Sequence, residues 1–467
     1  MNDNISKVFA YIDERSESFV SRLKEFLTQP CVVARGEGVQ ESARLVVGAL
    51  ASLGYAPELL SSGSSPPAVF SRIAGSSSLS LLFYNHYDVQ PEDPVDEWTS
   101  PPFRPEVRDG RVFARGVADN RGDFLARVFA VEAVLATAGR LPIEVKFFCE
   151  GEEEVGSPHL AHIVSQNAAK LKSDGCLWES SSRSSTGRIQ LFLGLKGMCA
   201  VQISVTGPRT DLHSSNATLV QNPAWRLISA LASLRDLSGR VLIPGFYDDV
   251  RPPTPEELAL AREIPFGEDE IKAKWGVDAF IGGVTGTDAL HRHLFDPTCN
   301  ICGLSAGYQG PGVKTVLPRL ASAKLDFRLV PHQNPERVFE LLKRHLDRSG
   351  FPDADVTLQG GLLPARTSPD APASRAAISA AKSIYPKEPI VFPSMAASGP
   401  MSLFTDDLAT PTVAAGVGND RSNIHGPNEN ILVEDLILGI KYVVALMYEM
   451  ARLNPGLHSG TAKGERT

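Results

Sequence analysis

The chain has 467 residues, which exceeds the roughly 250–300 residues at which one hydrophobic core usually stops growing, so we expect two domains. Apolar residues make up 43% and charged residues 21%, as in ordinary globular proteins, which excludes disorder, collagen and coiled coil for the chain as a whole. The formal net charge of −8, without a dense basic run, argues against nucleic acid or an anionic membrane surface as a partner.

The cysteines and the N-terminus indicate the compartment. Six cysteines in a chain of this length are too sparse for a disulfide scaffold. Cys299 and Cys302 form one C-x-x-C without the second pair that a zinc ribbon needs, and we interpret them as two buried thiols. Residues 1–19 lack the apolar core of a signal peptide, and no apolar run reaches the roughly 18 residues of a membrane span. We therefore expect a cytoplasmic protein that does not contact a membrane.

Hydrophobic periodicity in the first part of the chain predicts alternating helices and strands. Continuous apolar runs predict doubly buried strands, and apolar residues at helical spacing predict helices. The strands are expected at 79–84, 143–149 and 176–178, and the helices within 1–45 and over 41–53, 124–138 and 157–171. A strand, a crossover helix and a second strand together predict a parallel α/β sheet.

The pattern changes near residue 194. Strands are predicted at 198–205 and 323–330, and amphipathic helices at 223–234 and 335–346, which is an α+β pattern. Later segments return to the first pattern, with helices at 371–384 and 433–453, short strands at 389–392 and 411–415, and a polar tail at 457–467 that we expect to be disordered. The simplest division is a first domain made of residues 1–198 and 364–467, with a second domain, residues 199–363, inserted into it.

Five segments carry histidine or carboxylate side chains near predicted strand ends, where open α/β sheets form binding crevices. They contain His86 and Asp88, then Asp119, then the acidic run Glu152, Glu153 and Glu154, then Glu179, then His425. Each segment alone has an ordinary structural explanation, such as a helix N-cap or a solvated acidic loop. Together, two histidines and three carboxylates suit Zn²⁺ or Mn²⁺, and a shared carboxylate can hold two such ions about 3.5–4 Å apart.

In this order and spacing the segments resemble the M20 family of metallopeptidases, which includes carnosinase-like dipeptidases, aminoacylases, acetylornithine deacetylase and carboxypeptidase G2. The matching pieces are His86-x-Asp88-x-x-Pro91, Gly116-x-x-Asp119, Glu153-Glu154-x-Gly156-Ser157, Glu179 and His425. The resemblance spans nearly the whole chain. It implies an α/β catalytic domain with a mostly parallel, twisted sheet flanked by helices, and an inserted α+β, ferredoxin-like lid that forms a homodimer.

The resemblance also implies the role of each side chain. One divalent ion would be held by His86, Asp119 and Glu179, and a second by Asp119, Glu154 and His425. Asp88 would orient His86, Glu153 would be the general base, and Glu152 would be the non-catalytic member of the acidic run. Zinc is the expected metal, with manganese and cobalt as alternatives.

Three residues of the expected lid resemble family positions that contact substrate. His213, in Asp211-Leu212-His213-Ser214, would reach the partner subunit's site and stabilise the oxyanion. Arg328 would bind the substrate carboxylate, for which a bidentate guanidinium is suited. Ser398, in Ser398-Gly399-Pro400, would lie in the substrate loop.

The implied function is hydrolysis of the amide bond of dipeptides or other small peptides by a metal-activated water, with Glu153 as base. A deacylase acting on N-acyl amino acids uses the same machinery and is the alternative. Two further readings are a non-catalytic binding protein that keeps the fold, and a serine hydrolase built on Gly303-x-Ser305-x-Gly307. The serine motif requires a helix directly after it, and the glycine-rich sequence that follows disfavours one.

Overall fold

The computed structural model describes residues 3–453, so the polar tail at 457–467 lies outside the described residues. Contacts between residues divide the described chain into two compact units. Unit 1 comprises residues 3–194, 367–392 and 403–453, and unit 2 comprises residues 195–366 and 393–402. The domain boundaries drawn from the sequence, after residues 198 and 363, stay a prediction.

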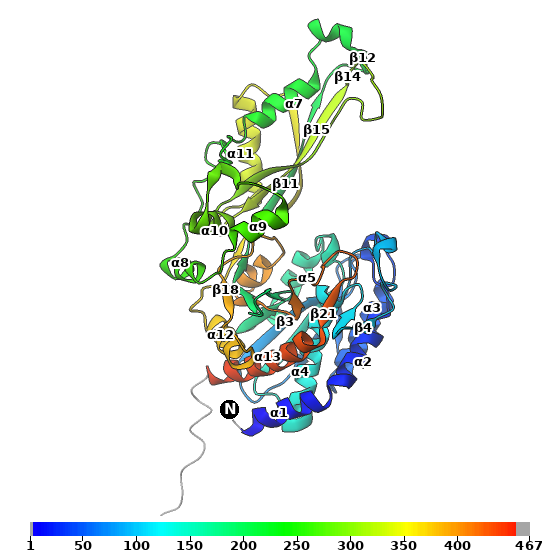
Figure 1. Ribbon diagram of the computed structural model, residues 1–467, viewed down its shortest axis with the longest axis vertical. Helices are drawn as coiled ribbons and strands as arrows, with labels where there is room; N and C mark the ends of the chain where they lie inside the picture. Colours follow the sequence, from blue (N-terminus) through cyan, green and yellow to red (C-terminus); the bar gives the residue numbers. More distant parts are fainter. Residues whose placement is uncertain (1–2, 454–467) are drawn as a thin grey trace, which may run out of the picture. The chain divides into compact units, whose positions relative to one another are not determined.

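Unit 1 is built on an eight-stranded sheet with the order β1-β2-β6-β3-β7-β19-β9-β18 (Figure 1). The central pairs β6–β3, β3–β7 and β7–β19 are parallel, as is β9–β18, whereas β19–β9 and the β1 and β2 edge are antiparallel. The expected mostly parallel sheet is therefore confirmed. Its strands are β1 (Glu58–Leu60), β2 (Ala68–Ile73), β3 (Ser80–His86), β6 (Glu144–Glu150), β7 (Gly175–Trp178), β9 (Gln190–Phe192), β18 (Ile390–Phe392) and β19 (Thr412–Ala414).

Helices cover this sheet, because its central strands are apolar on both faces. All seven residues of β3 are buried, so both faces of the central strand are shielded from water. Helices α4 and α12 each pack against α13, and α1 packs on α4 and α13 (Figure 1). The helices of unit 1 are α1 (Asp3–Glu14), α2 (Ser16–Leu27), α3 (Val39–Ala51), α4 (Gly122–Ala138), α5 (Leu160–Gln166), α6 (Ala168–Leu171), α12 (Pro372–Ile384) and α13 (Val433–Arg452).

Short strands tie down the loops of unit 1. A three-stranded antiparallel sheet has the order β21-β5-β4, and β20 pairs with β8 in parallel. These strands are β4 (Glu106–Arg108), β5 (Arg111–Phe113), β8 (Ser182–Arg183), β20 (Gly418–Asn419) and β21 (Asn430–Leu432). Since β21 and β5 are far apart in sequence, their pairing brings the loop before β21 beside the loop after β5.

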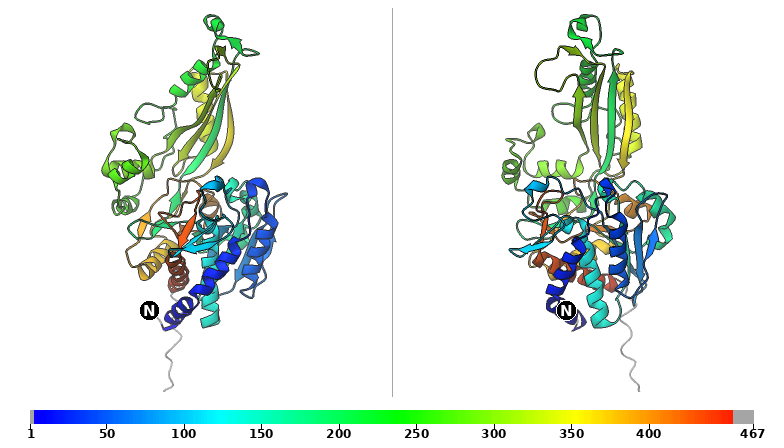
Figure 2. Two further views of the ribbon diagram at one scale, coloured as in Figure 1. Left: turned by 45° about the vertical axis from the view of Figure 1, so that its right-hand side comes forward. Right: turned by 90° about the vertical axis from the view of Figure 1, so that its right-hand side faces the viewer.

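Unit 2 is an antiparallel sheet with the order β13-β15-β11-β16 and two helices packed on it (Figure 2). The chain order β11–α7–β13–β15–α11–β16 is the ferredoxin-like arrangement that was expected. Buried and half-buried residues alternate along β11, so one face of the sheet forms the core with α7 and α11. The elements are β11 (Gly197–Thr206), α7 (Pro223–Ala232), β13 (Thr298–Ala306), β15 (Leu320–Leu329), α11 (Pro335–Arg348) and β16 (Ala354–Leu362).

Unit 2 also contains elements that the sequence reading did not predict. They are α8 (Pro255–Arg262), α9 (Glu268–Trp275), α10 (Gly286–Phe295), the pair β12 (Leu212–His213) and β14 (Val316–Leu317), and the short strand β17 (Ala365–Arg366), which pairs with β10 (Gly194–Leu195) at the boundary between the units. In α9, six of eight residues are charged or aromatic, in the sequence EDEIKAKW, so its apolar periodicity is weak.

Two expectations differ from the structure, and a third agrees with it. The single helix expected over 157–171 is two helices, α5 and α6, separated at Asn167. Cys299 is buried but Cys302 is exposed, because Cys302 occupies an irregularity in the pairing of β13 with β15. Ser305 lies inside β13 and is not followed by a helix, so the structure lacks the strand–turn–helix that a serine nucleophile of this motif needs. Within residues 3–453, no helix combines the length and apolar character required to cross a bilayer.

Candidate metal centre

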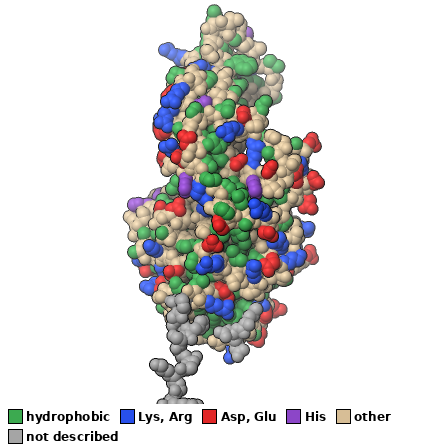
Figure 3. All heavy atoms as spheres, turned by 90° about the vertical axis from the view of Figure 1, so that its left-hand side faces the viewer, with side chains coloured by type: hydrophobic (Ala, Val, Ile, Leu, Met, Phe, Trp, Pro, Cys, Tyr) green, Lys and Arg blue, Asp and Glu red, His purple; other side chains and the backbone are tan. Residues whose placement is uncertain are grey.

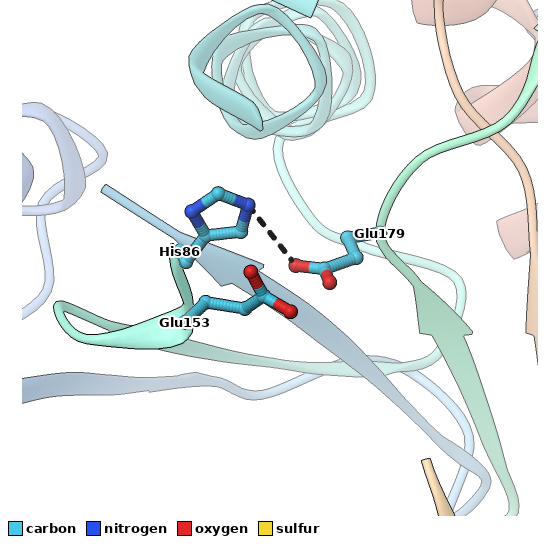
Figure 4. Close-up of side chains that lie close together, drawn as sticks. All are labelled: His86, Glu153 and Glu179. Carbon is cyan, nitrogen blue, oxygen red and sulfur yellow. Dashed lines mark ion pairs between the residues drawn. The ribbon is translucent and has the colours of Figure 1, made fainter. Parts of the chain in front are cut away.

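The candidate centre forms where three neighbouring parallel strands end. Strands β6, β3 and β7 are adjacent, so their carboxyl ends meet at one edge of the sheet. His86 is the last residue of β3, Glu153 follows β6, and Glu179 follows β7. Figure 4 shows the three side chains directed toward one another from these strand ends. This edge is where an open α/β sheet places a ligand site.

Asp119 lies between the two histidines. It belongs to the turn Val117–Arg121, which precedes α4. Its Oδ1 is 3.0 Å from Nε2 of His86, and its Oδ2 is 3.1 Å from Nε2 of His425. Each oxygen of one carboxylate therefore faces a different imidazole.

Two glutamates complete the cluster from opposite sides. Oε2 of Glu179 is 3.5 Å from Nε2 of His86, and Oε2 of Glu154 is 3.2 Å from Nε2 of His425. Two triplets also have ligand atoms all within 4.8 Å of one another: His86 with Glu153 and Glu179, and His86 with Asp119 and Glu154. Because His86 belongs to both triplets, these distances show that the residues lie at one place. They do not assign each residue to a particular ion.

Asp88 joins His86 to the acidic turn. Its carboxylate accepts hydrogen bonds from the backbone N–H of Glu153 at 3.2 Å and of Glu154 at 3.0 Å. The partner nearest to Nδ1 of His86 is the backbone carbonyl of Asp88 at 3.1 Å, and the Asp88 carboxylate is 3.4 Å away. The residue thus fixes the imidazole mainly through its backbone, while its carboxylate holds the turn.

The three consecutive glutamates point in three directions. Glu152 turns away from the centre and accepts hydrogen bonds from the backbone N–H of His159 at 2.9 Å and from its ring at 3.0 Å. Glu153 faces His86 and Glu179 (Figure 4). Glu154 faces His425 and accepts a hydrogen bond from Nε2 of Gln90 at 2.8 Å.

The charges in the centre perturb its titrating groups. Burial alone would lower the pKa of His86, but the carboxylates, with Glu179 foremost, raise it well above its usual value. Hydrogen bonds to Asp119 and Glu154 raise the pKa of His425 to about 10. Burial raises the pKa of Glu153 to about 7, and burial together with neighbouring carboxylates raises the pKa of Glu179 well above its usual value.

These perturbations fit a cluster that binds cations. Oε2 of Glu179 is buried and accepts no hydrogen bond, which is a costly state for a carboxylate oxygen unless a cation lies beside it. Imidazole nitrogen and carboxylate oxygen are the donors that Zn²⁺ and similar ions take. The residues present therefore fit divalent metal ions.

The other predicted residues lie in unit 2. Arg328 is on β15, where its Nε donates to Asp326 at 3.0 Å and its Nη1 donates to Oγ of Ser398 at 2.8 Å. Ser398 in turn donates to the carbonyl of Gly197. The structure thus brings Arg328 and Ser398 into direct contact.

His213 is exposed at the end of β12. Its Nδ1 accepts a hydrogen bond from the backbone N–H of Ser215 at 3.2 Å, and its Nε2 is 3.2 Å from Oγ1 of Thr315. Ser215 therefore helps to hold the imidazole.

Sequence reasoning missed three polar residues that support the centre: Gln90, Arg115 and Glu429. Each lies within four residues of a predicted ligand or of Asp88. Arg115 and Glu429 form a buried ion pair, each about 1% exposed, which no local sequence pattern signals. Their distant positions in the chain concealed the pairing.

Comparison with known proteins identifies the family. The model of "Peptidase family M20/M25/M40" matches residues 82–449. The chain is 30% identical to human Beta-Ala-His dipeptidase over 96% of this chain and 93% of that protein. It is 28% identical to a Cys-Gly metallodipeptidase of Schizosaccharomyces pombe over 97% of this chain and 100% of that protein.

Solved structures agree. An M20 family metallo-carboxypeptidase from Sulfolobus solfataricus superimposes with a TM-score of 0.88 at 39% identity, covering 93% of this chain and 99% of that one. A di-peptidase from Saccharomyces cerevisiae gives a TM-score of 0.82 at 26% identity, covering 97% and 100%. The chain therefore belongs to peptidase family M20/M25/M40 and is a peptide-hydrolysing enzyme.

Proposed function

We propose that the protein is a dipeptidase that works with two divalent metal ions. His86, Asp119 and Glu179 would hold one ion, and Asp119, Glu154 and His425 would hold the other. The observation that carries this proposal is the position of Asp119, whose two oxygens lie 3.0 and 3.1 Å from different histidines. A carboxylate in that position suits a bridge between two ions.

The bound ions would supply Lewis acidity, which lowers the pKa of water and polarises the scissile carbonyl. Glu153 takes the proton of the attacking water on its carboxylate and delivers it to the nitrogen of the leaving amine. Asp88 holds this base in place, since it accepts the backbone N–H of Glu153. Glu152 takes no part, because its carboxylate is committed to His159.

Unit 2 would act as the lid and recognise the C-terminal end of the substrate. Arg328 offers a guanidinium to the substrate carboxylate, and its contact with Ser398 supports a shared role for the two side chains. His213 would donate a hydrogen bond to the developing oxyanion in the partner subunit's site, a type of contact that can contribute about 3–4 kcal/mol.

A homodimer through unit 2 is supported by an uncovered surface. β13 is the edge strand of its sheet, and it exposes Ile301 and Leu304. A groove of about 480 Å³ lies between this strand and α7, and Leu237 beside it is 99% exposed. Figure 3 shows apolar side chains among the surface atoms of unit 2, in the upper part of the view. Exposed edge strands with apolar side chains are typically covered by a partner.

We propose zinc as the metal, with manganese or cobalt as alternatives, since all accept this nitrogen and oxygen donor set. A cytoplasmic location is supported by the cysteines, because all six are free and five of them are buried.

The relatives favour peptides over N-acyl amino acids as substrates. Two relatives that match nearly the whole chain are named dipeptidases, acting on Beta-Ala-His and Cys-Gly. The deacylase alternative receives no such support. The solved relative at 39% identity is a metallo-carboxypeptidase, so carboxypeptidase activity is a second candidate.

A hydrolysis panel distinguishes these activities. Protein reconstituted separately with Zn²⁺, Mn²⁺ and Co²⁺ is offered free dipeptides, the same dipeptides with a blocked amino group, tripeptides and N-acetyl amino acids. We expect the free dipeptides to have the highest kcat/KM. A higher kcat/KM for the blocked dipeptides would show that the protein is a carboxypeptidase. A higher kcat/KM for the N-acetyl amino acids would show that it is a deacylase. Failure to hydrolyse any of them with two ions bound would refute the proposed activity.

A further inference from the structure

Glu429 is a buried carboxylate around which the Asp119 turn is folded. It lies directly before β21 and is about 1% exposed. Its Oε1 accepts the backbone N–H groups of Ala118 at 2.8 Å and Asp119 at 3.1 Å, and its Oε2 accepts that of Gly116 at 2.9 Å. Three backbone donors within residues 116–119 are thus aimed at a side chain that lies 310 residues later than Asp119.

Arg115 extends this contact to two further segments. Its Nη1 donates to Oε2 of Glu429 at 2.8 Å. Its Nη2 donates to the carbonyl of Pro91 at 3.1 Å and to the carbonyl of His425 at 3.2 Å. One guanidinium therefore joins the loop after β3, the Asp119 turn and the His425 loop.

Apart from the contact with Arg115, His425 has few contacts that would fix its position. Its side chain is 51% exposed, and its φ of 63° lies in the left-handed region that favours glycine. His86, in contrast, is fully buried and continues the strand β3. The position of His425 relative to Asp119 consequently depends on groups that bind the backbone of its loop.

We propose that Arg115 and Glu429 are positioning residues that set the distance between His425 and Asp119, and so the affinity of the metal ion that uses His425. This inference rests on the proposed two-ion function. Neither residue reaches the reacting atoms in this assignment. Both act through the backbone of residues that we assign as ligands, as outer-shell partners do in other metal sites.

The inference makes a site-selective prediction. If the pair only stabilised the fold, its loss would weaken both ions equally or neither. If it positions His425, the ion held by His425 and Glu154 loses the most affinity, because the pair holds the His425 loop as well as the Asp119 turn. The ion held by His86 and Glu179 depends on the pair only through the shared Asp119, so it loses less. Substitution of outer-shell partners commonly costs about 10–100-fold in metal affinity.

The test is a calorimetric titration of the chelator-treated, full-length protein with Co²⁺, followed also by the visible absorption of the bound ion. Glu429→Gln removes the charge of the acceptor, and Arg115→Lys keeps the charge but removes the fork that reaches two carbonyls. We expect either variant to bind one Co²⁺ about 10–100-fold more weakly and the other within about threefold of the unsubstituted protein. If Glu429→Gln does not fold, Arg115→Lys carries the test.

Glu257→Gln is the matched control, because Glu257 is also a buried carboxylate paired with arginine but lies in unit 2 and contacts none of the assigned ligands. Its two Co²⁺ affinities should equal those of the unsubstituted protein. The inference would be overturned if both Co²⁺ affinities were unchanged in Arg115→Lys and in Glu429→Gln. It would also be overturned if these variants lost affinity equally at both sites. Fewer than two ions bound by the unsubstituted protein would instead overturn the proposed two-ion function.

Discussion

At the scale of single residues, adjacent glutamates have different surroundings and should have different roles. Glu153 faces His86 and Glu179, so geometry alone allows it to be either a base or a metal ligand. Glu152 faces His159 and allows neither.

We expect Glu153→Gln to lower kcat by at least about 10²–10⁴-fold, because a positioned proton acceptor is lost, and to leave two ions bound per chain. Steady-state kinetics and metal analysis of the purified variant measure the two quantities. Glu152→Gln should keep kcat near that of the unsubstituted enzyme. If Glu153→Gln binds only one ion, Glu153 is a metal ligand. If Glu153→Gln is active and Glu152→Gln is inactive, Glu152 is the general base.

Arg328 is the second residue whose role can be isolated. Its guanidinium is held by Asp326 and contacts Ser398. Charged hydrogen bonds contribute about 1.5–3 kcal/mol, which corresponds to about 10–100-fold in kcat/KM.

We expect Arg328→Met to reduce kcat/KM by that factor for a dipeptide and to have little effect on the same dipeptide amide, which lacks the carboxylate. The comparison of acid with amide isolates the contact from general damage to the site. An equal loss on both substrates would exclude Arg328 as the carboxylate receptor.

At the scale of elements, Glu257 joins α8 to the strand β17. Its carboxylate accepts hydrogen bonds from Arg251 at 2.7 Å and from Arg366 at 2.9 Å, and it completes the N-terminal capping box of α8 with Thr254. Although burial opposes it, these partners, with Arg251 and Arg366 foremost, lower the pKa of Glu257 below its usual value of 4.5.

A lowered pKa means that the ionised form is favoured by folding, so the stabilisation is complete above pH 4.5 and is lost as the pH falls through the folded-state pKa. We expect Glu257→Gln to lower the free energy of unfolding by about 1.5–3 kcal/mol at pH 7, since it removes charged hydrogen bonds and leaves two half-buried arginines without their carboxylate. The difference from the unsubstituted protein should shrink below pH 4.5. Urea unfolding at several pH values measures it, and a difference that does not vary with pH would contradict this account.

At the scale of the whole molecule, the proposed homodimer makes each site depend on two chains. If His213 acts in the partner subunit's site, a dimer of His213→Ala and Glu153→Gln chains contains one complete site. Each variant alone contains none.

We expect each variant to be nearly inactive alone. When the two chains are co-expressed in equal amounts, half of the dimers are mixed, and each mixed dimer has one complete site out of two. The mixture should therefore recover about a quarter of the full activity. Sedimentation of the same samples reports the dimer. A mixture no more active than the sum of its components, or an active monomer, would exclude a partner-supplied His213.

The residues that meet at the edge of the sheet could be predicted from the sequence because their chemistry is local. A histidine or carboxylate at the end of a buried apolar strand, or just after it, has few structural uses. His86 ends β3, Glu179 directly follows β7, and Glu153 lies three residues after β6. The parallel order of β6, β3 and β7 follows from the same apolar runs and crossover helix, so the edge of the sheet that carries the site was also predictable.

Tertiary structure alone decided which side chains meet across the chain. The directions of Glu152, Glu153 and Glu154 depend on His159, Asp88 and Gln90, and the pairing of Arg115 with Glu429 joins residues 314 positions apart. Helices α8 and α9 likewise lack strong apolar periodicity, and α8 is held by the contact of Glu257 with Arg366. Sequence determines what a residue can do chemically, whereas its partners are chosen by packing between distant segments, which no local pattern records.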